Sequence, residues 1–267
     1  MSDRNRGNDI AALDSSIVDS FVSFFSGYLI PGLGLPALKT SYTWSLPRSA
    51  SDFIGTLPEG NGYDANVGLK IGLHEKWKTS EDEQVRRNIA HWVIKNWGGV
   101  RGNRDETLAG YVDMADAEEP LTPIKGVASY SKLLSIVHPS KYAIYDARVA
   151  VALNAVQLFN GRKGIVFPYV SGRNKITGDS VNKRGFAKLR KFSARELERQ
   201  GWTVIAPRVG YQMYIQLLNE VRSRFTHKHE LHDFEMTLFS QAEQLAIRVA
   251  PELVTPHSYN RQRPSTI

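Results

Sequence analysis

The chain has 267 residues, enough for one large domain or for two small lobes that share a core. Hydrophobic residues make up 42% of it, which excludes wholesale disorder. There is no cysteine, so disulfides and thiolate chemistry are excluded. No stretch reaches the roughly 18 consecutive apolar residues of a transmembrane helix, and the polar first residues lack the apolar core of a signal peptide. We therefore expect a soluble, cytoplasmic protein with no membrane partner.

The charge of the chain is unevenly distributed. The net charge is +7, and the window 161–192 holds nine Lys and Arg residues against one acid, Asp179, which leaves +8 in that window alone. Such a stripe favours a polyanion partner, because lysine and arginine that neutralise phosphates release counterions. The alternative is a solvated surface loop and helix. The residues of this window that we expect to contact phosphates are Arg173, Lys175, Lys183 and Arg184.

Helical patterns dominate the chain, so we expect a mainly α fold. The N-terminal residues 1–14 are polar and expected to be flexible. An apolar, aromatic helix is expected over 17–29, where the Pro and Gly residues of 31–36 follow and stop it. The stretch 37–80 is expected to be loop-rich. A helix should then begin at Ser80, with Glu83 completing a capping box, and end at Trp97.

The second half of the chain is expected to continue in the same way. We expect one catalytic domain over 15–258, two-lobed and helical, followed by a disordered tail at 259–267. Two short extended pieces, 164–170 and 203–206, are expected to form at most a small β-hairpin. The further helices are expected at 106–114, 128–137, after residue 146, 194–200, 207–225 and 229–249.

One segment, 121–156, has the composition of a functional site. A tight turn built on Gly126 precedes a helix whose buried stripe includes Tyr130 and Leu134. A turn that leads into a helix N-terminus presents free backbone amides, which suits a phosphate. Lys132 lies about 200° around the helix from Tyr130, so we expect it to point away from the core. An extended link over 142–145 then brings Asp146 to the start of the next helix.

This arrangement resembles the helix-hairpin-helix superfamily of base-excision DNA glycosylases. In that family a glycine-containing hairpin grips the DNA backbone, and a catalytic aspartate follows about twenty residues later at the start of a helix. Gly126 and Asp146 occupy the matching positions. The family hairpin usually reads Leu-Pro-Gly-Val-Gly, and here Ala128 stands where the second glycine would be. The resemblance implies a two-lobed helix-hairpin-helix fold, a double-stranded DNA partner and no cofactor or metal.

The resemblance also implies a chemical role for Asp146. Cleavage of an N-glycosidic bond builds positive, oxocarbenium-like charge on the sugar, which a carboxylate can stabilise while it orients the attacking water. Members of the family that also cleave the DNA backbone use a lysine near the start of the second hairpin helix. That place, 127–129, has no lysine, so we expect a monofunctional hydrolase. Lys125, Gly126, Ala128, Lys132 and Arg148 would contact the DNA backbone.

A glycosylase extrudes its target base into a pocket lined by aromatic and polar groups. Our candidates for that pocket are Tyr42, Trp44, Trp97, Tyr145 and Tyr169, although for any single one of them core packing is the better explanation. Tyr145 is the first choice because it adjoins Asp146. The histidines at 227, 229 and 232 suggest a metal site, but a polar helix start explains them better.

The target base is the less defined part of this hypothesis. The stretches 131–135 and 145–149 resemble a branch of the superfamily that excises glucosylated hydroxymethylcytosine from phage DNA in antiviral defence. That resemblance implies a modified base as substrate, an abasic site as product and a monomeric enzyme. Three alternatives stay open: a housekeeping repair glycosylase, a non-catalytic DNA-binding protein in which Asp146 is only a helix cap, and a nuclease.

Overall fold

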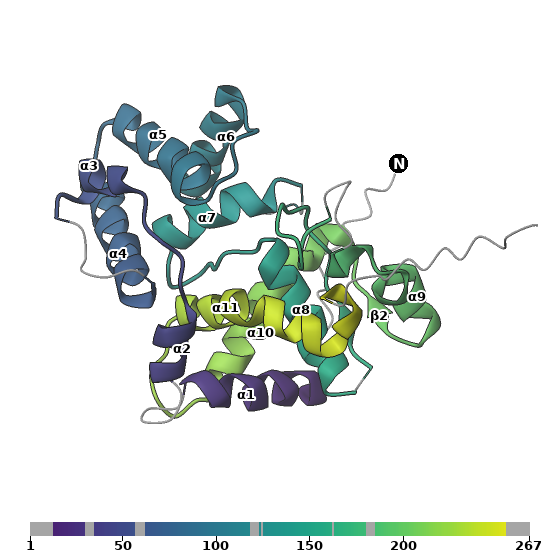
Figure 1. Cartoon of the computed structure of the whole chain (residues 1–267). Helices are drawn as coiled ribbons and strands as arrows, with labels where there is room; N and C mark the ends of the chain where they lie inside the picture. Colours follow the sequence, from purple (N-terminus) through teal and green to yellow (C-terminus); the bar gives the residue numbers. More distant parts are fainter. Residues whose placement is uncertain are drawn as a thin grey trace, which may run out of the picture.

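The computed structural model describes residues 13–29, 35–56, 62–117, 123, 125–161, 163–179 and 185–254 (Figure 1). These residues hold eleven α-helices and a single two-stranded sheet, which confirms the mainly α fold with a small β element. No helix in these ranges is long and apolar enough to cross a membrane.

The helices form two groups in space, with α7 between them (Figure 1). One group contains α3 to α6, and the other contains α1, α8, α10 and α11. The helices of the first half are α1 Ser15–Leu29, α2 Leu35–Ser41, α3 Ser51–Ile54, α4 Tyr63–Thr79, α5 Glu83–His91, the π-helix η2 Trp92–Trp97 and α6 Asp105–Asp116. Those of the second half are α7 Val127–Val137, α8 Ala147–Phe159, α9 Ala194–Arg199, α10 Gly210–Ser223 and α11 Leu231–Val249. Short 3-10 turns lie at Arg48–Ala50, Phe186–Lys188, Arg190–Phe192, Pro207–Val209 and Pro251–Leu253.

The connection between α7 and α8 is built as the sequence predicts. Gly126 precedes α7 with φ +83°, a left-handed conformation that glycine adopts without strain. Residues 142–146 form no regular element. Asp146 caps α8, because its side chain accepts hydrogen bonds from two backbone amides of the first turn. α8 then packs along α11, and this pair forms the centre of the second group.

The loop-rich interpretation of residues 37–80 is wrong, because α4 occupies Tyr63–Thr79. This helix buries polar side chains, Asn66 and Lys70, beside Leu69 and Leu73, so its sequence does not show a clean apolar stripe. The predicted cap at Ser80 is also wrong. α4 extends to Thr79, Ser80 ends it, and Asp82 caps α5 by accepting a hydrogen bond from the amide of Gln84.

The predicted β-hairpin is wrong as well. Strands β1 Ile165–Val166 and β2 Thr203–Val204 pair in parallel, with Ile165 opposite Thr203. A parallel pair needs a long crossover, which residues 167–202 supply. At the N-terminus, Asp14 is part of the fold, because its carbonyl accepts hydrogen bonds at the start of α1. The rest of the two expected flexible ends, 1–12 and 259–267, lies outside the described residues.

Candidate functional site

Asp146 is half-buried and lines a cleft of about 700 Å³. Its Oδ1 accepts hydrogen bonds from the amides of Arg148, at 2.9 Å, and Val149, at 3.1 Å. Among the described residues, none donates a hydrogen bond to Oδ2. The α8 N-terminus therefore fixes the carboxylate and keeps one oxygen available to a ligand.

A narrow inner pocket of about 40 Å³ adjoins this cleft. The two cavities share five lining residues, so the pocket opens from the cleft beside Asp146. These shared residues are Trp44, Gly98, Lys132, Asp146 and Phe239. The residues that line only the pocket are Tyr42, Trp97, Ile144 and Glu235.

Aromatic rings form the walls of the pocket around Phe239. The ring of Trp44 meets Phe239 edge-on, with centroids 5.6 Å apart, and Tyr42 lies at the same distance in a tilted arrangement. The Arg148 guanidinium lies 4.6 Å from the Phe239 centroid and forms an ion pair of 2.9 Å with Glu243. Such a set of rings offers flat apolar faces on which a planar ligand can stack.

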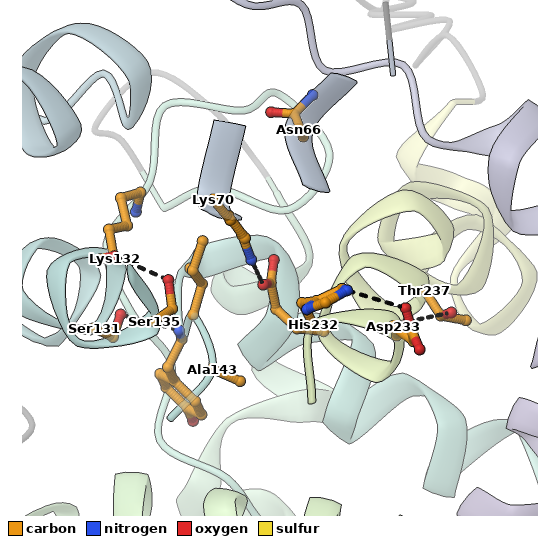
Figure 2. Close-up of polar contacts among 12 residues, drawn as sticks. Asn66, Lys70, Ser131, Lys132, Ser135, Ala143, His232, Asp233 and Thr237 are labelled. Atoms are coloured by element: carbon orange, nitrogen blue, oxygen red, sulfur yellow. Dashed lines mark hydrogen bonds and ion pairs between the residues drawn. The ribbon is translucent and has the colours of Figure 1, made fainter. Parts of the chain in front are cut away.

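A buried ion pair contributes one of the residues that line the pocket, Glu235. Lys70 of α4 pairs with Glu235 of α11, with Nζ 2.5 Å from Oε2, and both side chains are at most 4% exposed. Figure 2 labels Lys70 and marks its ion pair with a dashed line. Burial raises the pKa of the Glu235 carboxyl above its usual value, and the nearby Lys70 opposes that rise. This pair brings a second carboxylate into the pocket, besides that of Asp146.

Lys132 contradicts the expectation that it points away from the core. Its side chain is 6% exposed, lines both cavities and donates a hydrogen bond from Nζ to the carbonyl of Ala128. α7 lies between the two groups of helices, so nearly all of its side chains are buried. Gly98 provides the space, because a Cβ there would lie 2.3 Å from Cδ of Lys132. Burial lowers the pKa of Lys132, although Asp146 and Glu235 oppose that shift.

Three of the five predicted pocket aromatics, Tyr42, Trp44 and Trp97, do line the pocket. Tyr145 does not. Successive side chains of an extended link alternate in direction, and here Ile144 and Asp146 face the pocket while Tyr145 faces the core. There its hydroxyl donates to the carbonyl of Pro168. Tyr169 is absent from the pocket too, and its hydroxyl donates to the carbonyl of Phe192.

The residues that we predicted to contact DNA do not all lie in the cleft. Ala128, Lys132, Arg148 and Arg173 line the cleft with Asp146, and Arg173 reaches across it to the carbonyl of Gly99 at 2.6 Å. The other predicted contacts lie elsewhere: Lys125 is exposed in the turn beside Gly126, Lys175 is exposed, and Lys183 and Arg184 lie outside the described residues.

The N-terminus of α7 lies at the edge of the same cleft, where Ala128 lines it. No described side chain caps α7, and although the amide of Ser129 donates to the carbonyl of Gly126, those of Val127 and Ala128 have no acceptor among the described residues and are available to an external one.

The sequence did not identify Lys70, Glu235 or Phe239 as site residues. A signal was present for two of them, because Glu235 and Phe239 are one helical turn apart and Glu235 is an acid within an apolar run. Within the described ranges no group of His, Asp and Glu is arranged to hold a metal ion, and of the three histidines His227 is exposed while His229 is buried just before α11. His229 and His232 both lie beside Asp233.

Comparison of the chain with protein-family models, with curated proteins and with solved structures finds no match.

Proposed function

We propose that this chain is a monofunctional DNA glycosylase, which hydrolyses the N-glycosidic bond of a modified base and leaves an abasic site. One observation carries the proposal. Asp146 presents a carboxylate oxygen in a cleft, directly beside a pocket walled by Trp44 and Phe239. A glycosylase needs this pairing, because the carboxylate acts on the sugar while the extruded base occupies the pocket.

Asp146 would act on the sugar as the bond to the base breaks. Positive charge then develops at C1′ and O4′, and Oδ2 stabilises it at short range in a partly buried site. The same oxygen orients a water molecule toward C1′, and the water supplies the hydroxyl that replaces the base. The two amide hydrogen bonds to Oδ1 hold the carboxylate in place, so no reorganisation is needed during the step.

The two cavities suit a base that carries a bulky polar group, such as glucosylated hydroxymethylcytosine. The flat ring would lie at the mouth of the inner pocket, against Trp44 and Phe239, whose rings contact each other edge-on and line both cavities. A sugar on the ring would extend into the wider cleft, where Arg101, Ser171 and Asn174 supply hydrogen-bonding groups.

Double-stranded DNA would lie across the mouth of the cleft, bound by a monomer. The uncapped first turn of α7 faces a backbone phosphate, with Lys125 beside it. Arg173 and Lys175, from the basic window 161–192, would contact further phosphates. Binding should therefore weaken steeply as the salt concentration rises.

The test is a panel of duplexes with modified bases, glucosylated cytosines included, scored for abasic sites and for the released base by mass spectrometry. Asp146→Asn keeps the cap but removes the charge, and should reduce base release by at least a hundredfold while DNA binding persists. Asp82→Asn is the matched control, since Asp82 caps α5 in the same way far from the cleft. Full activity of Asp146→Asn would refute the mechanism. Salt-dependent binding without release of any base would indicate a DNA-binding protein instead.

The position of Lys132 favours a second candidate, a glycosylase that also cleaves the DNA backbone. Burial favours the neutral amine, which is the nucleophilic form, and Lys132 lines both cavities with Asp146. Attack of Nζ on C1′ would break the N-glycosidic bond, with the base leaving together with a proton from the amine, and opening of the C1′–O4′ bond would then give a Schiff base with the opened sugar. Borohydride should then trap a covalent protein–DNA complex that Lys132→Met abolishes. Base release without a trapped complex supports the monofunctional enzyme.

A further inference from the structure

Glu235 shares the pocket with Asp146 but belongs to a distant part of the chain. It extends from α11, one turn before Phe239, and both side chains line the inner pocket. Asp146, the cap of α8, and Lys132 of α7 line the same pocket. A ring that stacks on Phe239 would therefore bring its edge close to the Glu235 carboxylate.

The hydrogen bonds of Glu235 are incomplete. Lys70 donates to Oε2 at 2.5 Å, and no donor to Oε1 is present among the residues that the structure describes. The side chain is only 1% exposed, so bulk water has little access to it. Oε1 is not a fully enclosed acceptor, because Glu235 lines the inner pocket, and a ligand there that supplies an N–H group can form a hydrogen bond with it.

The edges of nucleobases differ in what they offer to such an acceptor. Cytosine and adenine carry an exocyclic amino group, whose N–H can donate to a carboxylate. Uracil and hypoxanthine carry a carbonyl oxygen at the same ring position, which would direct lone pairs against Oε1. The carboxylate thus attracts one pair of bases and repels the other.

We propose that Glu235, held in place by Lys70, selects bases with an exocyclic amino group for the Asp146 cleft. This inference rests on the proposed function, because it takes the ligand of the pocket to be an extruded base. It makes Glu235 a specificity-determining residue and defines the substrate as a cytosine- or adenine-type base. Lys70 is a positioning residue, because it acts on the base only through Glu235.

The experiment uses pairs of duplexes that differ only at the amino position. Glucosylated hydroxymethylcytosine is paired with glucosylated hydroxymethyluracil, and adenine with hypoxanthine, so the two arms distinguish a pyrimidine from a purine. Binding to the Asp146→Asn variant is measured by fluorescence anisotropy, and single-turnover base release is measured with the unaltered protein. In at least one arm the amino-bearing duplex should bind and react about five- to 150-fold better.

Variants at Glu235 then connect that preference to the carboxylate. Glu235→Gln presents both a donor and an acceptor, so the preference should fall to about one. Glu235→Gln alone leaves the buried Lys70 without a charged partner. The double variant Lys70→Met with Glu235→Gln removes that lysine as well, and it should also lose the preference for amino-bearing bases. Glu252→Gln, on an exposed ion pair with Lys191, is the matched control and should keep it. Thermal unfolding confirms that each variant is folded.

The outcomes separate the two proposals. If the amino-bearing duplex binds better but no base is released, the hydrolytic function fails and the role of Glu235 stands. If bases are released without any preference, or the preference persists in folded Glu235→Gln, the role of Glu235 is overturned and hydrolysis stands. Equal binding of every duplex likewise overturns the role of Glu235.

Discussion

Replacement of Lys70 by methionine should destabilise the protein strongly. Methionine has nearly the volume of lysine, so the substitution removes the charge from the buried pair with Glu235 without opening a large cavity. Removal of one partner of a buried ion pair costs about 3–5 kcal/mol, because the other charge is left in a medium of low polarity. For a chain of this size that free energy corresponds to a fall of about 6–20 °C in the melting temperature.

The pH dependence tests the physical reason for this loss. Burial already raises the pKa of Glu235, and Lys70 opposes the rise, so Lys70→Met should raise that pKa further. The folded variant then binds a proton more readily than the unfolded chain does. Above the raised pKa, Glu235 is charged in the folded variant, and the full loss of stability should be measured. As the pH falls through the raised pKa toward 4.5, the ordinary pKa of a glutamate, the folded variant binds a proton and the loss should become smaller. Urea denaturation at pH 8 and pH 5 measures both limits.

A double variant supplies the control for this prediction. Lys70→Met combined with Glu235→Leu removes both charges and should recover most of the stability, because buried ion pairs are often no better than apolar residues of similar volume. The reasoning fails if Lys70→Met alone changes the free energy of unfolding by less than about 1 kcal/mol, or if the double variant is no more stable than the single one.

Three further changes probe the surroundings of the site. Gly126→Ala forces a left-handed backbone on alanine and should cost at least about 1–2 kcal/mol of unfolding free energy, measured in urea. Gly98→Ala would place its Cβ 2.3 Å from Cδ of Lys132 and 2.8 Å from the carbonyl oxygen of Val93, so we expect a displaced Lys132 side chain, weaker DNA binding, measured by anisotropy, and a loss of stability. Tyr63→Phe removes the hydroxyl that donates to Asp233 at 2.5 Å and should cost about 1.5–3 kcal/mol in the same urea assay.

Each of these has a result that contradicts it. An unchanged stability of Gly126→Ala would mean that the turn before α7 tolerates another conformation. Unchanged DNA binding by Gly98→Ala would mean that Lys132 contributes nothing to the cleft. A neutral Tyr63→Phe would mean that Asp233 finds another donor at no cost.

The sequence alone determined the local features of this protein. Most of the helical patterns, the turn at Gly126 and the cap at Asp146 depend on bonds between residues a few positions apart, and the structure agrees with these, although the cap predicted at Ser80 lies at Asp82 instead. The same reasoning failed at α4, because its polar side chains Asn66 and Lys70 are buried by distant partners that no local pattern records.

Only the tertiary structure decided which side chains meet Asp146. Lys70 and Glu235 are 165 positions apart, and their pairing depends on how α4 and α11 approach each other. Lys132 is buried because α7 lies between two groups of helices and Gly98 leaves room for it, whereas helical periodicity treats the side away from Tyr130 as open to solvent. Periodicity gives the direction of a side chain relative to its own helix, and packing alone determines what lies in that direction.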